Sequence, residues 1–214
     1  MRITYSIQVC NESRELYSLL NFLSKTIENE DEVNVVVDSN RITDRVESVL
    51  EHFKERITVF KRPFDNFYLN SEFHISVATG DYIFHVDADE MPQELLIRNL
   101  KNIIKDSGAE IIAVPRINID PGSTEAFLER CNYKINDVGW INWPDFQTRI
   151  FKKCDHIKWT DEMHTKLSGT NKAVALKPEP KLAIWHIKSI EKEENRWKDG
   201  NIITSNDNLY DKLM

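Results

Sequence analysis

The chain has 214 residues, of which 41% are hydrophobic and 29% are charged, so it is long enough to bury the core of an ordinary globular domain. Its net charge of -7 argues against a protein that holds nucleic acid by neutralising the phosphate backbone. No apolar run approaches the roughly 20 residues of a membrane span, and the N-terminal run is too short and too polar for a signal peptide.

The three cysteines, Cys10, Cys131 and Cys154, are an odd number and show no metal-type spacing. Free thiols are typical of a reducing compartment. We therefore expect a cytoplasmic protein.

The first half of the chain alternates strand and helix patterns four times. Strands are predicted at Ile3–Val9, Val33–Val37, Ile57–Phe60 and Tyr82–Val86. Apolar residues at helical spacing follow each strand, over Leu16–Ile27, Val46–Phe53, Leu69–Val77 and Leu95–Ile104. This alternation predicts an α/β fold: a mostly parallel, Rossmann-like sheet flanked by helices, with a ligand cleft at the carboxyl edge of its strands.

Local signals predict where these helices begin and end. Asn11 or Ser13 is expected to cap the first helix, and Thr43 the second. Pro92 is expected in the first turn of the fourth helix, with Glu90 as a helix N-terminal carboxylate ahead of it. Gly108 should end that helix.

Beyond a fifth strand at Ile111–Val114 the pattern changes. The segment Asn118–Trp140 is irregular and long for a connection, as binding loops often are. Short strand-like runs follow at Phe146–Phe151, Ala173–Leu176 and Leu182–Ile187, and these predict a small mixed or antiparallel extension. A last amphipathic helix is expected over Ser189–Trp197, with a polar tail from Gly200.

Carboxylates gather where two of the predicted strands end. Asp87, Asp89 and Glu90 follow the strand Tyr82–Val86, and Asp38 follows Val33–Val37. Closely spaced carboxylates repel one another, so a cation is their natural partner. A solvated acidic turn would have the same spacing, and the pattern alone leaves both possibilities open.

Four stretches identify a family when they are taken together. They are Cys10–Glu12 after the first strand, VDSN at Val37–Asn40, GDYIFHVDADE at Gly80–Glu90, and WPDFQTRIFKK at Trp143–Lys153, the last followed by Trp159 and His164. In this order they resemble the family-2 nucleotide-sugar glycosyltransferases of the GT-A fold, especially the small bacterial and phage branch. The resemblance covers roughly residues 1–190 of the chain.

The resemblance implies roles for the strand-end carboxylates. Asp89 would bind Mn²⁺ or Mg²⁺, hard cations that keep several waters and need only one or two carboxylates from the protein. Asp87 would accept from the ribose or reach the metal through water. Asp38 would accept from the uracil or ribose, and Glu12 lies where the family reads the nucleotide. Each of the four could instead be a solvated strand-end or cap carboxylate.

The second half supplies the remaining candidates. By resemblance, His186 reaches back to the metal, and His164 competes for that role. An inverting transfer needs a carboxylate that takes the proton of the acceptor hydroxyl, and Asp145 and Glu162 are the candidates for this base. Relatives carry a glutamate after the histidine where this chain has Thr165.

Three further predictions concern side chains with two possible roles. Arg149 faces a phosphate of the donor or forms an ion pair. Trp140, Trp143 and Trp159 offer aromatic faces to a sugar or belong to the core. His85 is expected to point away from the carboxylates and to be structural.

The predicted organisation is one GT-A domain with a nucleotide-sugar-binding half (1–117), an acceptor half (118–188) and a C-terminal helix and tail (189–214). The expected activity is inverting, metal-dependent transfer from a nucleoside-diphosphate sugar, preferably a UDP-sugar. The acceptor would be a hydroxyl of a glycan, a lipopolysaccharide intermediate or another lipid-linked acceptor. Two alternatives stay open: glycosylation of modified DNA bases, and a non-catalytic module that binds nucleotide-sugars.

Overall fold

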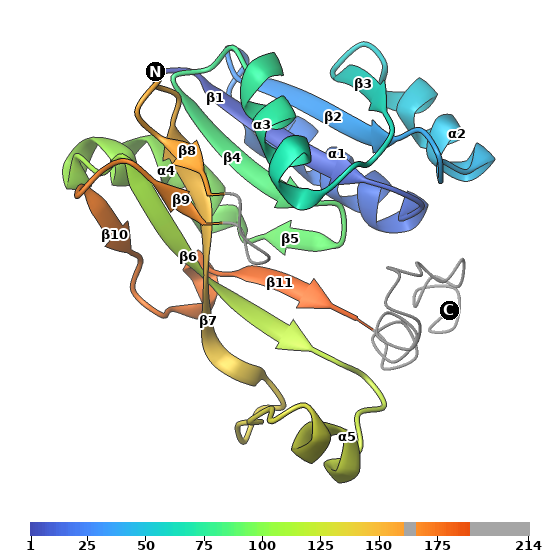
Figure 1. Ribbon diagram of the computed structural model, residues 1–214, viewed down its shortest axis with the longest axis vertical. Helices are drawn as coiled ribbons and strands as arrows, with labels where there is room; N and C mark the ends of the chain where they lie inside the picture. The colour runs from blue at the N-terminus through green and yellow to red at the C-terminus, as the bar shows by residue number, and fades with distance from the viewer. Residues whose placement is uncertain (161–165, 189–214) are drawn as a thin grey trace.

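The computed structural model describes residues 1–160 and 166–188, and within them the chain builds one large sheet with helices on both faces (Figure 1). The sheet runs in the order β3-β2-β1-β4-β7-β6-β11-β5, and β10 pairs with β6. Its strands are β1 (Ile3–Val9), β2 (Glu32–Asp38), β3 (Thr58–Arg62), β4 (Tyr82–Asp87), β5 (Glu90–Pro92), β6 (Ile111–Ile119), β7 (Ile141–Lys152), β10 (Ala173–Ala175) and β11 (Ile184–Ile187).

The first four long strands, β3, β2, β1 and β4, are parallel, as the strand–helix alternation predicts. β7 is antiparallel to both of its neighbours, β4 and β6, so β6 has the same direction as β4. β11 is parallel to β6, and β5 closes that edge in antiparallel pairing. The predicted parallel sheet with a mixed extension is confirmed.

Helices cover the two faces of the sheet unequally (Figure 1). They are α1 (Ser13–Thr26), α2 (Asp44–Phe53), α3 (Phe67–Val77), α4 (Glu94–Ser107), the short α5 (Glu125–Arg130) and a 3-10 turn, η1 (Pro180–Leu182). Among these described helices, none has both the length and the apolar character needed to cross a bilayer.

The core is divided by the sheet into two parts. The larger part joins α1, α2 and α4 to alternate residues of the parallel strands, such as Tyr5 and Phe84, because successive side chains of a strand face opposite sides. The smaller part joins Ile83, Phe151 and Trp159 to the α3 side, next to the hairpin of β8 (Lys158–Trp159) and β9 (Leu167–Ser168). Apolar burial on both faces is why the central strands are nearly continuous hydrophobic runs.

Two glycines have clear structural reasons. A Cβ on Gly80, just before β4, would lie 2.7 Å from the Thr4 nitrogen and 2.9 Å from the Arg2 carbonyl, so only glycine lets β4 start this close to β1. Gly108 has φ 60° and donates its N–H to the Ile104 carbonyl, which ends α4 as predicted.

Several local predictions need correction. Pro92 lies in β5 rather than in a helix, and α4 begins only at Glu94. Neither Asn11 nor Ser13 caps α1, since Glu12 occupies the N-cap position and makes no side-chain cap bond. The segment predicted to be irregular contains α5, and β7 begins at Ile141, five residues earlier than expected. The helix predicted over Ser189–Trp197 lies outside the described residues.

Candidate active site

The predicted carboxylates lie where β1, β2 and β4 end at one edge of the sheet. β1 sits between the other two strands: Val9 is in register with Val37 of β2, and Gln8 with Asp87 of β4. The chain continues from β1 to β2 and β3 on one side and returns to β4 on the other. Open α/β sheets bind their ligands at such a switch point.

Asp38 and Glu12 both bond to backbone amides. Asp38 Oδ1 accepts from the nitrogens of Asn40 (3.0 Å) and Phe64 (3.2 Å), so this carboxylate joins the loops that follow β2 and β3. Glu12 Oε2 accepts from the nitrogens of Cys10 (2.9 Å) and Asn11 (3.0 Å). Both side chains thereby shape the loops beside the end of β1.

Arg149 of β7 joins two of the acidic residues that follow β4. Its Nη2 donates to Asp87 Oδ2 at 2.6 Å and to Glu90 Oε1 at 2.5 Å. Burial, the largest single influence, would raise the pKa of Asp87, but the charge and hydrogen bond of Arg149 together with the charge of His85 outweigh it and lower this pKa to about 2. Of the two roles predicted for Arg149, the structure contains the ion pair.

Glu90 is fully buried and receives a second guanidinium, because Arg116 Nη1 donates to Glu90 Oε1 at 3.1 Å. The prediction that Glu90 is a helix N-terminal carboxylate is therefore wrong, since Glu90 begins β5 and the helix starts only at Glu94. Glu90 lies at the start of β5, and its side chain contacts Arg116 of β6 and Arg149 of β7. A buried charge needs such partners, since desolvation without them costs several kcal/mol.

Both carboxylate oxygens of Asp145, a residue of β7, accept hydrogen bonds. Its Oδ2 accepts from Arg116 Nε (2.9 Å), Arg116 Nη2 (2.7 Å) and Asn118 Nδ2 (2.8 Å), and its Oδ1 accepts from Gln147 Nε2 (2.7 Å). Burial would raise the pKa of Asp145, but Arg116 and the amides outweigh it, so the pKa lies below its ordinary value. A carboxylate held in this way is poorly suited to accept a proton. The other predicted base, Glu162, lies outside the described residues, as does His164.

A chain of hydrogen bonds fixes the proton on His186. Asn118 must direct its Nδ2 donor at Asp145, because an ionised carboxylate can only accept. Its Oδ1 therefore faces His186 Nδ1, at 2.9 Å, and that nitrogen carries the imidazole proton. Burial, with the charge of Lys188, lowers the pKa of His186, which keeps the ring neutral. The lone pair of Nε2 then faces Asp89 Oδ2 at 3.7 Å.

Two electron-rich atoms that face each other in this way fit a divalent cation between them. A neutral histidine whose second nitrogen donates to a fixed acceptor is the usual form of a metal ligand. Within residues 1–160 and 166–188, no three histidine, cysteine, aspartate or glutamate side chains gather into a complete metal site. Asp89 and His186 would therefore share the ion with water and phosphate oxygens, as Mg²⁺ sites commonly do.

Two buried histidines lie beneath the carboxylates. His85 and Asp87 are two residues apart in β4, so they share a face of the strand, and the prediction that His85 points away from the carboxylates is wrong. The ring of His85 lies 4.5 Å from that of His74, whose Nδ1 bonds Ser6 Oγ at 2.6 Å. Burial, reinforced by the charge of Arg149, lowers the pKa of His85 to about 4. Both rings are thus neutral near pH 7.

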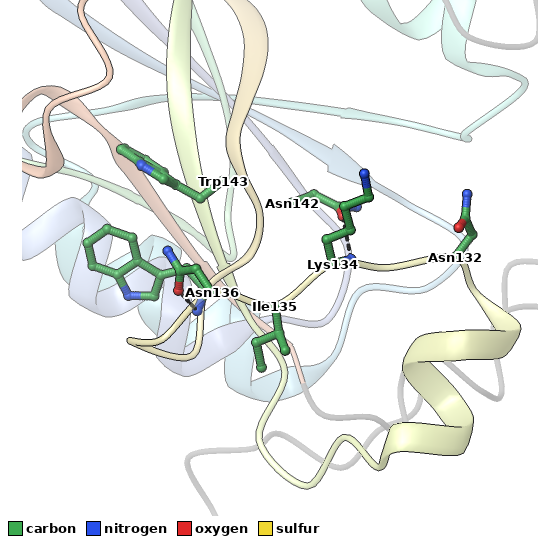
Figure 2. A pocket seen from close by; sticks show the side chains of 7 residues that line it. Asn132, Lys134, Ile135, Asn136, Asn142 and Trp143 are labelled. Atoms are coloured by element: carbon green, nitrogen blue, oxygen red, sulfur yellow. Dashed lines mark hydrogen bonds between the residues drawn. The ribbon is translucent and has the colours of Figure 1, made fainter.

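The tryptophans divide into core and surface. Trp159 is 9% exposed and packs edge-on against Phe151 and His85, so it belongs to the core. Trp140 and Trp143 are half-buried, with ring centroids 5.1 Å apart and an angle of 66° between their planes. Both line a pocket of about 390 Å³ at the far end of the β6–β7 pair (Figure 2).

The sequence prediction missed two residues of this network, Arg116 and Asn118, and assigned Glu90 to a helix N-terminus. A signal for both missed residues was present, because Arg116 and Asn118 are alternate polar positions in the otherwise apolar run IIAVPRINI. The predicted strand ends at Val114, short of both residues, and the predicted irregular segment begins only at Asn118. Its continuation to Ile119 is what directs Arg116 and Asn118 at Asp145.

Comparison with known proteins gives a consistent picture. The sequence model described as glycosyl transferase family 2 matches residues 6–167, more than half of the chain. Among solved structures, residues 1–349 of TarS from S. aureus align over 87% of this chain and 60% of theirs, with a TM-score of 0.62 and 15% identity. The same protein in complex with UDP-GlcNAc aligns over 88% of this chain and 59% of its own, with a TM-score of 0.60 and 15% identity. No match was found among curated sequences.

Proposed function

Because the chain belongs to glycosyltransferase family 2 and has the GT-A fold, we propose that it transfers a sugar, with inversion and with help from a divalent metal, from a nucleoside-diphosphate sugar to an acceptor hydroxyl. A UDP-sugar is the proposed donor, since the related fold of TarS was solved with UDP-GlcNAc. The proposed acceptor is a hydroxyl of a glycan or a lipid-linked saccharide. The chain spans about 60% of the TarS segment, so these proposals concern the transferase domain itself.

The observation that carries this proposal is the arrangement of Asp38, Asp87 and Asp89 around the end of β1. Asp38 and Asp87 end the two strands that flank β1, and Asp89 follows the second of these strands, at the switch point of the sheet. In the proposed complex, Asp38 accepts from the base or ribose, and Asp87 accepts from the ribose. Arg149 keeps Asp87 ionised and oriented for that bond. Glu12 shapes the loop beside the base.

Asp89 and His186 are the proposed metal ligands, with Mn²⁺ or Mg²⁺ as the ion. The bound ion would neutralise the developing charge of the leaving diphosphate, in a chain whose own net charge is -7. The protein's contribution is to hold the Nε2 lone pair of His186 toward Asp89 through Asn118 and Asp145. Asp145 is therefore proposed as a positioning residue.

The base that takes the acceptor proton is proposed to be Glu162. The hydrogen bonds that occupy both oxygens of Asp145 support this choice over the other predicted carboxylate. The base would lie on the side of the sugar opposite the diphosphate, as an inverting displacement requires.

Release of UDP from radiolabelled UDP-sugars, with and without a saccharide acceptor and Mn²⁺, tests the proposed function. Asp89→Asn should lose at least about 100-fold in this activity, because metal ligation and diphosphate release both depend on it. Asp106→Asn, an exposed carboxylate at the end of α4, is the matched control and should behave as wild type. If Asp89→Asn retained wild-type activity, the proposed metal site would be wrong. If wild type bound UDP-sugars but never released UDP, the chain would be a binding module and not a transferase.

A further inference from the structure

The pocket of Trp140 and Trp143 lies on the side of the site away from the nucleotide strands. It is formed by the segment between β6 and β7 together with the start of β7, next to α5 (Figures 1 and 2). Trp143 precedes Asp145 by two residues in β7, and Asp145 is bonded to Arg116 and Asn118 of the site. The pocket therefore adjoins the metal side of the site, with the base-binding edge of β1 and β2 beyond it.

The walls of this pocket are aromatic and amide-rich. It is lined by Asn132, Lys134, Ile135, Asn136, Trp140, Asn142 and Trp143. Its volume of about 390 Å³ lies within the range of small-molecule sites, which is roughly 300 to 1,000 Å³. The two indoles are tilted by 66°, so one can cover the apolar face of a saturated ring while the other borders its edge.

Three of the side chains that line the pocket, those of Lys134, Asn136 and Asn142, present donors to a ligand. Asn136 Oδ1 already accepts from the nitrogens of Val138 (3.2 Å) and Trp140 (2.8 Å), and Asn142 Oδ1 accepts from the nitrogen of Lys134 (2.9 Å). These bonds turn the two amide oxygens toward the loop. In the described part of the chain, the Nδ2 groups of Asn136 and Asn142 and the amine of Lys134 make no hydrogen bond or ion pair, so they are available to accepting oxygens of a ligand.

We propose that this pocket binds a pyranose residue of the saccharide acceptor, an inference that rests on the transferase function proposed above. A pyranose has an apolar face of C–H groups for the indoles and a rim of hydroxyl oxygens for the three donors. The loop is held by its own hydrogen bonds, so binding costs little ordering of the protein. The pocket thus selects acceptors in which a second sugar ring flanks the hydroxyl that reacts.

The experiment measures binding of full-length protein to immobilised oligosaccharides of defined structure, in the absence of donor. The panel contains neutral hexopyranose, N-acetylhexosamine and hexuronate oligomers, with an acyclic polyol phosphate for comparison. Wild type should bind at least one pyranose oligomer and not the polyol phosphate. Trp143→Ala and Trp140→Ala should each weaken that binding by about ten-fold or more, as truncation of a buried aromatic anchor does.

Two controls separate this effect from misfolding and from the donor site. Phe146→Ala removes another exposed aromatic side chain of β7 that does not line the pocket, and it should bind as wild type. Trp143→Phe should restore part of the affinity. Each variant is also tested for stabilisation by UDP with Mn²⁺, which should be unchanged in the tryptophan variants.

The outcomes are distinguishable. Loss of oligosaccharide binding with intact UDP binding supports the proposal. Tryptophan variants that bind oligosaccharides like wild type, or a wild type that binds none of the panel while still binding UDP, overturn it. Loss of UDP binding in the tryptophan variants would mean that the pocket holds the donor, which also overturns it. Tryptophan-dependent saccharide binding in a wild type that binds no nucleotide would overturn the transferase function and with it the acceptor role of the pocket.

Discussion

At the scale of single residues, Glu90 has the most consequential environment in the site. Its side chain is fully buried, and the guanidinium groups of Arg116 and Arg149 both reach its Oε1. A buried carboxylate needs these partners. Removing one of them destabilises the fold strongly, because it leaves a buried charge uncompensated, whereas the intact ion pair adds little net stability. The network therefore organises the site more than it stabilises the fold.

Arg149→Met tests this dependence. The change leaves Glu90 with Arg116 as its charged partner, besides the backbone N–H of Asp87, and removes the guanidinium that binds Asp87. We therefore expect the free energy of unfolding to fall by about 3 kcal/mol. Urea unfolding measures it. Arg98→Met, which breaks the exposed pair with Glu94, is the matched control and should cost at most about 1 kcal/mol. Equal losses in the two variants would show that burial of the Glu90 network has no special cost.

Asn118→Leu tests the proton position on His186. The change removes the acceptor of His186 Nδ1, so the ring should shift from the Nδ1–H tautomer toward the Nε2–H tautomer. Nitrogen-15 NMR of the imidazole detects this directly. Mn²⁺ affinity in the presence of UDP should fall by about 10- to 100-fold. Asn99→Leu, on the exposed side of α4, is the control. An unchanged tautomer in Asn118→Leu would refute the proposal that Asn118 fixes the proton on Nδ1 of His186.

At the scale of elements, β4 packs apolar side chains on both of its faces and adds His85 and Asp87 to one of them. Phe84 and Val86 pack into the larger core, while His85 and Asp87 face α3 and Arg149. The charges of Arg149, Asp87 and Glu90 all act on His85, and burial with Arg149 lowers its pKa to about 4. This strand should therefore make stability depend on pH.

The sign of this dependence follows from proton binding. Between the ordinary pKa of 6.5 and the folded value of about 4, the unfolded chain binds a proton at His85 that the folded chain does not. The contribution of His85 to the free energy of unfolding is therefore fully present above about pH 6.5 and is lost as the pH is lowered. The loss from this group should be about 2 kcal/mol between about pH 7.5 and about pH 5.

His85→Phe should remove this part of the slope while preserving an aromatic ring beside His74 and Trp159. Urea unfolding at the two pH values measures it. Some dependence of the free energy of unfolding on pH should remain in this variant, weaker than in wild type, because the pKa values of His74 and His186 are also lowered by burial. A variant with the full wild-type slope would show that His85 is not the titrating group.

The approach of β4 to β1 gives a second prediction at this scale. In Gly80→Ala the new methyl group would meet backbone atoms of Arg2 and Thr4 at under 3 Å, so the strands must separate. We expect a loss of about 1 to 3 kcal/mol in stability, as in other overpacked sites. Gly108→Ala is the comparison: its methyl group meets open space, and only the positive φ of 60° costs about 1 kcal/mol. A stability of Gly80→Ala equal to wild type would exclude the close approach.

At the scale of the whole molecule, donor binding should stabilise the fold by mass action. UDP at about 100 times its dissociation constant, with Mn²⁺, adds about 2.7 kcal/mol and should raise the melting temperature by about 5 to 10 °C. A thermal-shift screen of UDP-, GDP- and dTDP-sugars would identify the preferred nucleotide. Asp38→Asn should reduce the shift and Asp106→Asn should not. If no nucleotide produced a shift in wild type, the donor site would have to be abandoned.

The strand–helix order of the first half, the parallel sheet and the carboxylates at its edge could be predicted from the amino-acid sequence, because they depend on local periodicity and on which residues follow each strand. Asp38 and Asp87 lie beside β1 for that reason alone. The family resemblance came from the same local stretches.

Only the tertiary structure decided what those carboxylates contact. Arg149 reaches Glu90 across 59 positions of the chain, and His186 reaches Asn118 across 68. No periodicity encodes such pairs, since they depend on β7 inserting between β4 and β6 and on β11 pairing with β5. The long pairing of β6 with β7 brings Asp145, one of the two predicted bases, to Arg116 and Asn118, and four hydrogen bonds hold its carboxylate. Tertiary packing also leaves Trp140 and Trp143 half-buried beside each other and places Trp159 in the core.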